Sequence, residues 1–240
     1  DKSLLKKATL YVSLEPCSHH GKTPPCCNYI IDNNIPKIVI GCKDSSAKVN
    51  GAGIKTLIDA GIDVKVSVLE KECRILNKRF FTFHEKKRPF IILKWAKTKD
   101  NFIDIDRSKN NKGIAWITTK NTKLLTHKFR AEEDAILVGR KTIKNDNPSL
   151  TTRAYDGSDP KRFIIDPNLK LDCNYNIFKT RIIVFNIIKN DKVTNITYIK
   201  LDLNNFIPEL LDYLYNNKIQ SIIIEGGKTT LNNFIASGFW

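Results

Sequence analysis

Short apolar runs that alternate with helical stretches limit the fold of this sequence more than any other feature. In the first part of the chain this alternation predicts strands at residues 8–14, 37–42 and 63–68, with helices at 27–34 and 53–61. Strands that are separated by single helices and short connections pair in parallel, because a helix carries the chain back across the sheet. We therefore expect an α/β unit with a parallel sheet.

The same alternation begins again after a boundary. Residues 70–88 predict a polar helix that ends in basic residues, and Pro89 cannot continue it. The second part of the chain predicts strands at 90–96, 135–139, 162–166, 181–185 and 221–227, with helices at 119–130, 206–217 and 228–237. We place the boundary between domains 1–86 and 87–240 and expect a second α/β unit.

Composition sets the range of partners. With 240 residues, 41% of them hydrophobic, the chain can bury one large core or two modest cores. Lys and Arg outnumber Asp and Glu by 40 to 25, and this excess favours phosphorylated metabolites, phosphate-bearing cofactors or nucleic acid. The alternative is a drift in composition, with lysines that only solvate the surface. We favour drift over a nucleic-acid stripe because the lysines are scattered.

Several classes of protein are excluded. Six cysteines in a chain of this length are too few for a disulfide scaffold, and no apolar run reaches the 18 residues of a membrane span. We expect a protein of the reducing cytoplasm that does not bind a membrane. The chain contains no methionine and begins within a helical pattern. We therefore expect a fragment that is truncated at both ends.

The segment from Pro16 to Cys26 follows the first predicted strand directly and carries a metal-ligand pattern. Zinc-dependent nucleobase deaminases have an H-x-E motif followed by P-C-x-x-C, in which the Glu moves protons and binds no metal. Here the second motif is stretched to eight residues between Cys17 and Cys26, and the first motif is absent. The alternative is a pair of buried thiols. Cys27 could substitute as a ligand, although a side chain at that point of a helix would face elsewhere.

Basic and acidic side chains in the second half have ordinary explanations as well as functional ones. Arg130 and Arg153 suit phosphate, since a guanidinium group binds two oxygens at once, but Arg130 could instead pair with Asp134 four residues on. Lys94 in an apolar strand is harder to explain structurally, because buried lysines are rare. Glu225, which precedes two glycines at a strand end, suits a ligand site there.

These motifs together resemble one family. The sequence is similar to the bifunctional deaminase/reductase family of riboflavin biosynthesis through Pro16–Cys26, Lys94-Trp95-Ala96, Trp116-Ile117-Thr118, Arg130–Gly139, Asp146–Arg153 and Glu225-Gly226-Gly227. The resemblance covers nearly the whole chain. The stretched cysteine motif is highly specific, whereas the Glu-Gly-Gly motif alone would be weak.

The resemblance implies two activities and two folds. It implies a truncated cytidine-deaminase-like α/β/α domain that hydrolytically deaminates a phosphoribosylaminopyrimidine, using zinc. It further implies a dihydrofolate-reductase-like α/β/α domain that reduces the ribose to ribityl with NADPH. The substrate would be a phosphorylated ribosylaminopyrimidine. The resemblance also leads us to expect a homo-oligomer without a nucleic-acid partner.

The resemblance also assigns site residues. It implies zinc ligands at Cys17 and Cys26, a deaminase substrate site at His19 and Lys22, a catalytic Lys94, reductase substrate contacts at Arg130, Leu150, Arg153 and Glu225, and cofactor contacts at Ala96, Trp116, Thr142, Asp146 and Gly227. Outside the resemblance, Asp146 would be a turn former, Trp116 a core residue, and His19 and His20 an inert surface pair. Ile114 departs from a Ser in many relatives, which puts one substrate hydrogen bond in doubt.

Three functions stay open at this point. The first is the bifunctional enzyme that the resemblance implies, present here as a fragment. Because the H-x-E motif is absent, we expect no deaminase turnover from this fragment, since two thiolates alone do not complete a catalytic zinc site. One alternative is a riboflavin-pathway reductase with a degenerate deaminase domain. Another is a basic zinc module that binds RNA, although no aromatic residues are interleaved with a basic stripe.

Overall fold

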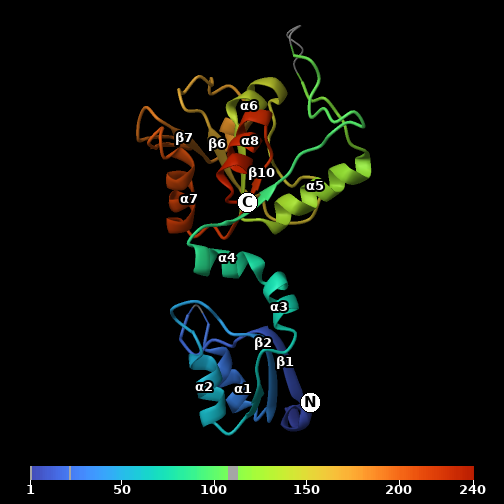
Figure 1. Cartoon of the computed structure of the whole chain (residues 1–240), viewed down its shortest axis with the longest axis vertical. Coiled ribbons are helices and arrows are strands. Elements are labelled where there is room, and N and C mark those ends of the chain that lie inside the picture. The colour runs from blue at the N-terminus through green and yellow to red at the C-terminus, as the bar shows by residue number, and fades with distance from the viewer. Residues whose placement is uncertain (1, 22, 108–112) are drawn as a thin grey trace. The chain divides into compact units, whose positions relative to one another are not determined.

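The computed structural model describes residues 2–21, 23–107 and 113–240, and it divides the chain into two compact units. The first unit is Asp1–Lys87 and the second is Arg88–Trp240, each built around its own sheet (Figure 1). Among the described helices, none combines the length and the apolar character that crossing a membrane requires.

The first unit has a parallel sheet with strand order β1-β2-β3. Its elements are η1 (Lys2–Lys7), β1 (Thr9–Leu14), α1 (Cys26–Asp32), β2 (Lys37–Cys42), α2 (Ala52–Asp59), β3 (Asp63–Lys65), α3 (Glu70–Leu76) and α4 (Lys78–Lys86). Helices α1 and α2 pack through Ile30 and Leu57 on Ile38 and Ile40 of β2. On the other face, Gly41 lies so close to Cys73 of α3 that a Cβ there would overlap the sulfur.

The second unit has a seven-stranded sheet with strand order β4-β10-β5-β6-β7-β9-β8. Its elements are β4 (Phe90–Leu93), α5 (Lys120–Glu132), β5 (Ala135–Gly139), α6 (Arg140–Asp146), β6 (Lys161–Ile165), η2 (Asn176–Lys179), β7 (Ile182–Asn186), β8 (Asp191–Val193), β9 (Ile196–Lys200), α7 (Phe206–Asn216), β10 (Ser221–Ile224) and α8 (Lys228–Ser237). All neighbouring strands are parallel except β8 and β9, which pair antiparallel.

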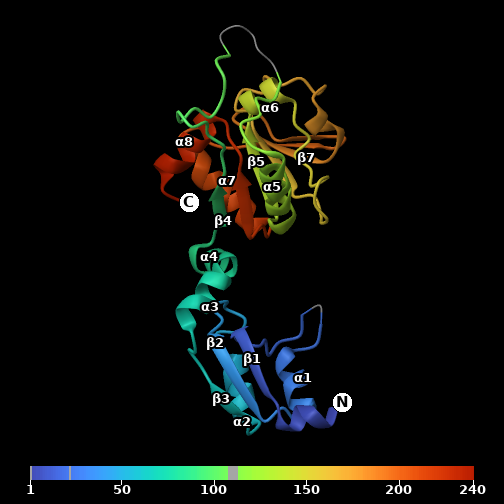
Figure 2. The ribbon, with the colours of Figure 1, turned by 90° about the vertical axis from the view of Figure 1, so that its right-hand side faces the viewer.

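Both faces of this sheet are covered, which explains why its central strands read as unbroken apolar runs. One face packs against α7 and α8 (Figure 2). Leu210, Leu214 and Phe234 are among the buried residues of this contact. The other face packs against Ile143 of α6 and Ile177 of η2. Every residue of β5 and β10 is buried as a result.

The predicted alternation is confirmed for most elements, and the differences have local causes. Strand β4 stops at Leu93 and not at residue 96, because its neighbour β10 ends at Ile224 and the last ladder bond runs from the Lys94 backbone N–H to the Ile224 carbonyl. The predicted helix over 70–88 is two helices. They are divided at Asn77, whose side chain bonds back to the Cys73 carbonyl and to Ser13.

The aromatic core of the second unit gives a stability test. Phe185 is fully buried, stacked on Phe163 with ring centroids 5.6 Å apart and edge-on to Tyr213 at 5.4 Å. We expect Phe185→Ala to lower the free energy of unfolding by about 3–5 kcal/mol, because it removes a buried ring and leaves a cavity. Phe102→Ala is the control, since Phe102 is 63% exposed, and should cost less than about 0.5 kcal/mol. Urea titrations that find equal losses would contradict this assignment of the core.

Candidate active site

Three strands of the second sheet end side by side at its carboxyl edge. Ile224 of β10 lies opposite Leu93 of β4 and Leu137 of β5, and all three strands run parallel. The residues that follow them, including Lys94 and Glu225, therefore reach the same edge. In open parallel sheets this edge is where ligands bind, because the helices leave the strand ends uncovered there.

A buried ion pair joins this edge to helix α5. The Arg130 guanidinium group contacts the Glu225 carboxylate twice, with Nη2 2.7 Å from Oε2 and Nε 3.1 Å from Oε1. The two side chains are 11% and 8% exposed. The alternative pairing of Arg130 with Asp134 is therefore wrong. Asp134 instead accepts a hydrogen bond from the backbone N–H of Gln220.

Arg130 also reaches the segment that carries two other predicted substrate residues. Its Nη1 donates to the Thr151 carbonyl at 3.2 Å. Leu150 is buried and adopts a left-handed backbone with φ +55°, which turns the chain here. Arg153 Nη1 donates to Thr151 Oγ1 at 3.1 Å. Arg130 and Arg153 thus both contact Thr151, the residue after Leu150, and Arg130 links Thr151 to Glu225.

The glycine loop after β10 forms the next part of the site. Gly226 has φ +104° and its carbonyl accepts from the Gly139 N–H at the end of β5, and the Gly226–Gly227 peptide bond is cis. A Cβ at Gly227 would lie 3.5 Å from Thr142 Oγ1, so two predicted cofactor residues face each other. Helix α8 begins at Lys228, directly after the loop. Its first backbone N–H groups form a site suited to an anion.

Other predicted residues lie on the segment between β4 and α5. Lys94 and Ala96 follow β4 and are half-buried. Trp116 is 59% exposed, and its ring lies 4.6 Å from Lys123 Nζ, so the core explanation for this residue is wrong. Trp116, Thr119 and Lys123 line a cavity of about 210 Å³ at the start of α5. Among the described residues, no side-chain hydrogen bond or ion pair joins Lys94 to Arg130 or Glu225.

Asp146 is the last residue of helix α6, and it binds the segment between β4 and α5 through Arg107. It accepts from Arg107 Nη2 at 3.3 Å, and Arg107 also binds Asp104 at 2.6 Å and the Gly113 carbonyl at 2.9 Å. Burial raises the pKa of the Asp146 carboxyl group, Arg107 opposes that rise, and Asp104 adds to it. Asp146 is therefore an ion-pair residue rather than a turn former alone. The sequence did not suggest a role for Arg107, because nothing in it indicates that the chain brings Arg107 next to Asp146 of α6.

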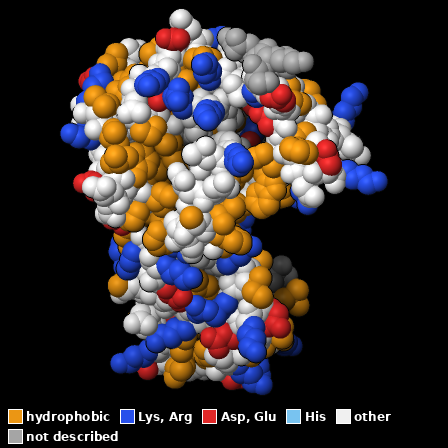
Figure 3. Space-filling view, turned by 45° about the horizontal axis from the view of Figure 1, so that its top comes forward, with side chains coloured by type: hydrophobic (Ala, Val, Ile, Leu, Met, Phe, Trp, Pro, Cys, Tyr) orange, Lys and Arg blue, Asp and Glu red, His pale blue; other side chains and the backbone are white. Residues whose placement is uncertain are grey.

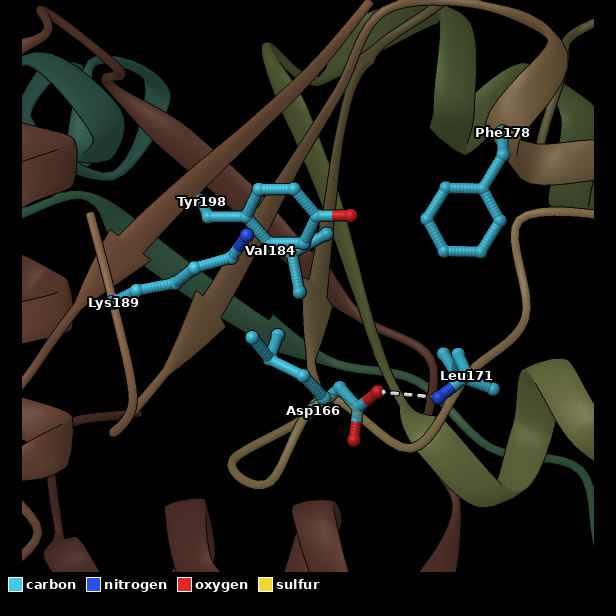
Figure 4. Close-up of a pocket in the computed structure, with 7 residues that line it drawn as sticks. Asp166, Leu171, Phe178, Val184, Lys189 and Tyr198 are labelled. Carbon is cyan, nitrogen blue, oxygen red and sulfur yellow. Dashed lines mark hydrogen bonds between the residues drawn. The ribbon is translucent and has the colours of Figure 1, made fainter. Parts of the chain in front are cut away.

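Two buried groups of the second unit were also missed. His127 lies one turn before Arg130 and is 2% exposed, yet helix periodicity alone cannot tell a polar inner face from a solvated one. Asp166 borders a separate cavity of about 170 Å³, with Lys189 and Tyr198 on its wall (Figure 4). One Asp166 oxygen accepts from the Leu171 N–H, and the other lies 3.7 Å from Arg140 Nε. None of the predicted site residues lines this cavity.

In the first unit, the two predicted zinc ligands lie close together. The Cys26 backbone N–H points to Cys17 Sγ at 3.4 Å, and a hydrogen bond with Cys17 raises the pKa of the Cys26 thiol. Cys27 points away, toward the carbonyls of Pro16 and Gly53, and burial raises its pKa to about 11. Glu15, which comes directly after β1, holds the connection between β2 and α2, because its buried carboxylate accepts N–H bonds from Asp44, Gly51 and Ile54.

This donor set does not complete a zinc site. Among the described residues, no three His, Cys, Asp or Glu side chains are grouped so that they could hold a metal ion. His19 is half-buried with its Nδ1 unpartnered among the described residues, and the predicted phosphate residue Lys22 lies outside them. We therefore derive no metal-dependent step from these residues.

The fold and the site define an α/β domain with a buried Arg–Glu pair and a glycine loop at the carboxyl edge of parallel strands. A family model described as the RibD C-terminal domain matches residues 89–240. The chain is 37% identical to the riboflavin biosynthesis protein RibD of Aquifex aeolicus over 243 residues, which cover 98% of this chain and 67% of that protein.

Solved structures agree with this match. The chain is similar to a diaminohydroxyphosphoribosylaminopyrimidine deaminase/5-amino-6-(5-phosphoribosylamino)uracil reductase from Thermotoga maritima, with a TM-score of 0.85 and 36% identity over 95% of this chain and 64% of that one. Acinetobacter baumannii RibD gives a TM-score of 0.82 at 25% identity, covering 100% of this chain and 68% of the other.

The chain belongs to the RibD family of riboflavin biosynthesis proteins, and its second unit is the C-terminal reductase domain of that family. The family expected from the sequence is thus confirmed. The chain spans about two thirds of the length of the relatives that it matches.

The buried ion pair gives the second test. We expect Glu225→Gln to lower the free energy of unfolding of the second unit by about 3 kcal/mol, because the Arg130 charge stays buried without its partner. The control is Glu132→Gln, since Glu132 pairs with Lys128 at 3.7 Å where both are nearly half exposed, and should change stability by less than about 0.5 kcal/mol. Equal effects in chemical denaturation would mean that the Arg130 pair is solvated.

His127 gives a prediction for pH. Burial and then the nearby Arg130 and Arg153 lower the pKa of His127 in the folded chain, so the unfolded chain binds a proton more readily. Stability is therefore full above the ordinary histidine pKa of about 6.5 and falls below it, by at most about 1.4 kcal/mol per pH unit.

Tryptophan fluorescence can follow this loss, because all three tryptophans lie in the second unit. His127→Gln should reduce the slope between about pH 6.5 and 5. An unchanged slope in that variant would show that His127 is not the group responsible.

Proposed function

We propose that residues 88–240 reduce the ribose of a deaminated ribosylaminopyrimidine phosphate to ribityl with NADPH. The observation that carries this proposal is the buried pair of Arg130 and Glu225 at the carboxyl edge, beside Arg153 and the glycine loop. It agrees with the activity of the Thermotoga maritima relative, which is a deaminase and a phosphoribosylaminouracil reductase.

The phosphate of the substrate is assigned to the two arginines. Arg130 is oriented by Glu225 and by the Thr151 carbonyl. Arg153 donates to the hydroxyl oxygen of the same threonine, Thr151. A guanidinium group stays charged and offers paired donors, which suits phosphate oxygens. Leu150 has a left-handed backbone, and the carbonyl of the next residue, Thr151, accepts from Arg130.

The glycine loop fits the cofactor. Gly227 leaves space beside Thr142, and the backbone N–H groups at the start of α8 suit the cofactor phosphates. Asp146, Trp116 and Ala96 remain the other residues that we assign to the cofactor side. When bound, NADPH supplies the hydride, and the protein supplies its position and surroundings.

Lys94 is the residue that we assign to the reacting sugar. It follows β4 directly opposite the end of β10, so it emerges at the same edge as Glu225. Reduction adds a hydride to the sugar carbon that is attached to nitrogen. The bond between this carbon and the ring oxygen breaks, which leaves negative charge on the oxygen. The Lys94 ammonium donates a proton to that oxygen as charge develops there. The products of these two transfers are the ribityl chain and its secondary amine.

For the first unit we propose a deaminase relationship without assigning turnover. Its Cys17 and Cys26 are the two ligands that it would contribute to zinc, and His19 and Lys22 are the phosphate contacts that we propose for a deaminase substrate. The described residues lack a third ligand. Hydrolysis is therefore not assigned to residues 1–87, and a reductase without deamination stays a second candidate.

The partners follow from the same site. We propose a phosphorylated small molecule as the substrate, and we propose no nucleic-acid partner. Lys and Arg side chains are scattered over the face in Figure 3, with apolar and neutral groups between them. A cytoplasmic location and a homo-oligomer stay predictions from the sequence.

The decisive measurement is NADPH oxidation, followed by absorbance, with the deaminated ribosylaminouracil phosphate as substrate. We expect steady oxidation by the chain and at least a hundredfold lower kcat for Lys94→Ala, since general acid catalysis contributes about 10²–10⁴-fold. Lys128→Ala is the matched control, because Lys128 lies on the exposed face of α5 and pairs with Glu132.

The two outcomes separate the candidates. Activity that depends on Lys94 and not on Lys128 supports the reductase. If the folded chain binds no NADPH and oxidises none, the proposal for residues 88–240 is wrong. Steeply salt-dependent binding of RNA in the same preparation would then favour the zinc module.

A further inference from the structure

Helix α5 departs from the usual amphipathic pattern, because its one buried residue is polar and several of its apolar side chains are exposed. The whole helix is described, and its one buried residue is His127. Leu124 and Leu125 are 49% and 45% exposed. Lys123, His127 and Arg130 are spaced four and three residues apart, so they share one helix face. A domain helix ordinarily buries its apolar face, so this polar inner face calls for a ligand or a partner.

His127 lies at the centre of this polar face with an unused ring nitrogen. Its side chain is 2% exposed, and Nδ1 has no hydrogen-bond partner among the described residues. The backbone of Thr151 acts on the imidazole by raising its pKa, against the effect of burial, and the Thr151 carbonyl accepts from Arg130. A buried nitrogen without a partner is costly, which indicates that something else binds there.

The charged groups that we identify around His127, within the described chain, are mainly positive. Lys123 and Arg130 lie on its own helix, and Arg153 comes from the segment after α6. The carboxylate of Glu225 on β10 is already paired with Arg130. Burial and then these cations lower the pKa of His127, which favours the neutral imidazole in the free chain. A dianion bound between the arginines would reverse this balance.

We propose that His127 takes up a proton from solvent when a phosphate monoester binds between Arg130 and Arg153. Nδ1 then changes from an unused acceptor into an N–H donor, and a phosphate oxygen is the acceptor that it lacked. The phosphate is held by an imidazolium as well as by two guanidinium groups. This inference rests on the proposed function for the identity of the ligand, and it adds a residue that the sequence did not suggest.

The test uses the four histidines of the chain as probes in NMR. The ring C–H signals are followed against pH with ribose 5-phosphate as the probe, and with ribose as the control without phosphate. His127→Gln identifies the His127 signal by its loss. We expect the His127 midpoint to rise by about one pH unit or more with ribose 5-phosphate and to stay fixed with ribose.

Calorimetry provides a second measurement that does not depend on one variant. Titration of ribose 5-phosphate at pH 7 in two buffers of different ionisation enthalpy gives the number of protons taken up. We expect uptake by the unsubstituted chain, loss of uptake in His127→Gln and in Arg153→Leu, and unchanged uptake in His84→Gln. Arg153 is exposed, so its replacement leaves the fold intact.

The outcomes are distinct from those of the NADPH assay. A fixed His127 midpoint at saturating ribose 5-phosphate, uptake that persists in His127→Gln, or no binding of the probe would each overturn the proposal. A chain that shifts the His127 midpoint but oxidises no NADPH would keep the phosphate site and remove the reductase reaction.

Discussion

The buried contact between Arg130 and Glu225 determines most of what lies around it. It joins α5 to the end of β10, and through the Thr151 carbonyl it joins both to the segment that carries Leu150 and Arg153. Two opposite charges in a space that excludes water are stabilised when each is paired, and are costly when either stands alone. The domain therefore keeps a cation at the strand ends without leaving it uncompensated, and the phosphate that we propose as ligand would share that cation.

The strands of the second sheet could be predicted because both of its faces are covered, so that β5 and β10 are apolar throughout. The short hairpin of β8 and β9 could not, since Asp191–Val193 is polar and has one neighbour. Helix α6 was missed for a different reason. It follows β5 without a connecting turn. The sequence before Arg140 therefore contains no N-capping side chain that would mark the start of a helix, since the N-cap residue is Gly139.

Some residues of the candidate site could be predicted where the sequence is unusual, but not where their contacts are long-range. Glu225, Gly227 and Arg130 follow strands or lie on a helix face, and the structure gathers them at one edge. Arg107 and His127 gave no signal, because the first depends on a chain return to Asp146 and the second on a helix that turns its polar face inward. Local pattern does not contain either kind of information.

Helix α5 is attached to its domain by directed polar contacts more than by apolar burial. Such a helix has little hydrophobic area to lose on opening, so it belongs to the least stable cooperative units of a fold. Its detachment would expose Arg130 and His127 together, and a dianion that bridges Arg130 and Arg153 would oppose it. Part of the free energy of ligand binding would therefore be used to order α5. Occupancy of the site and the local rigidity of α5 would then be coupled.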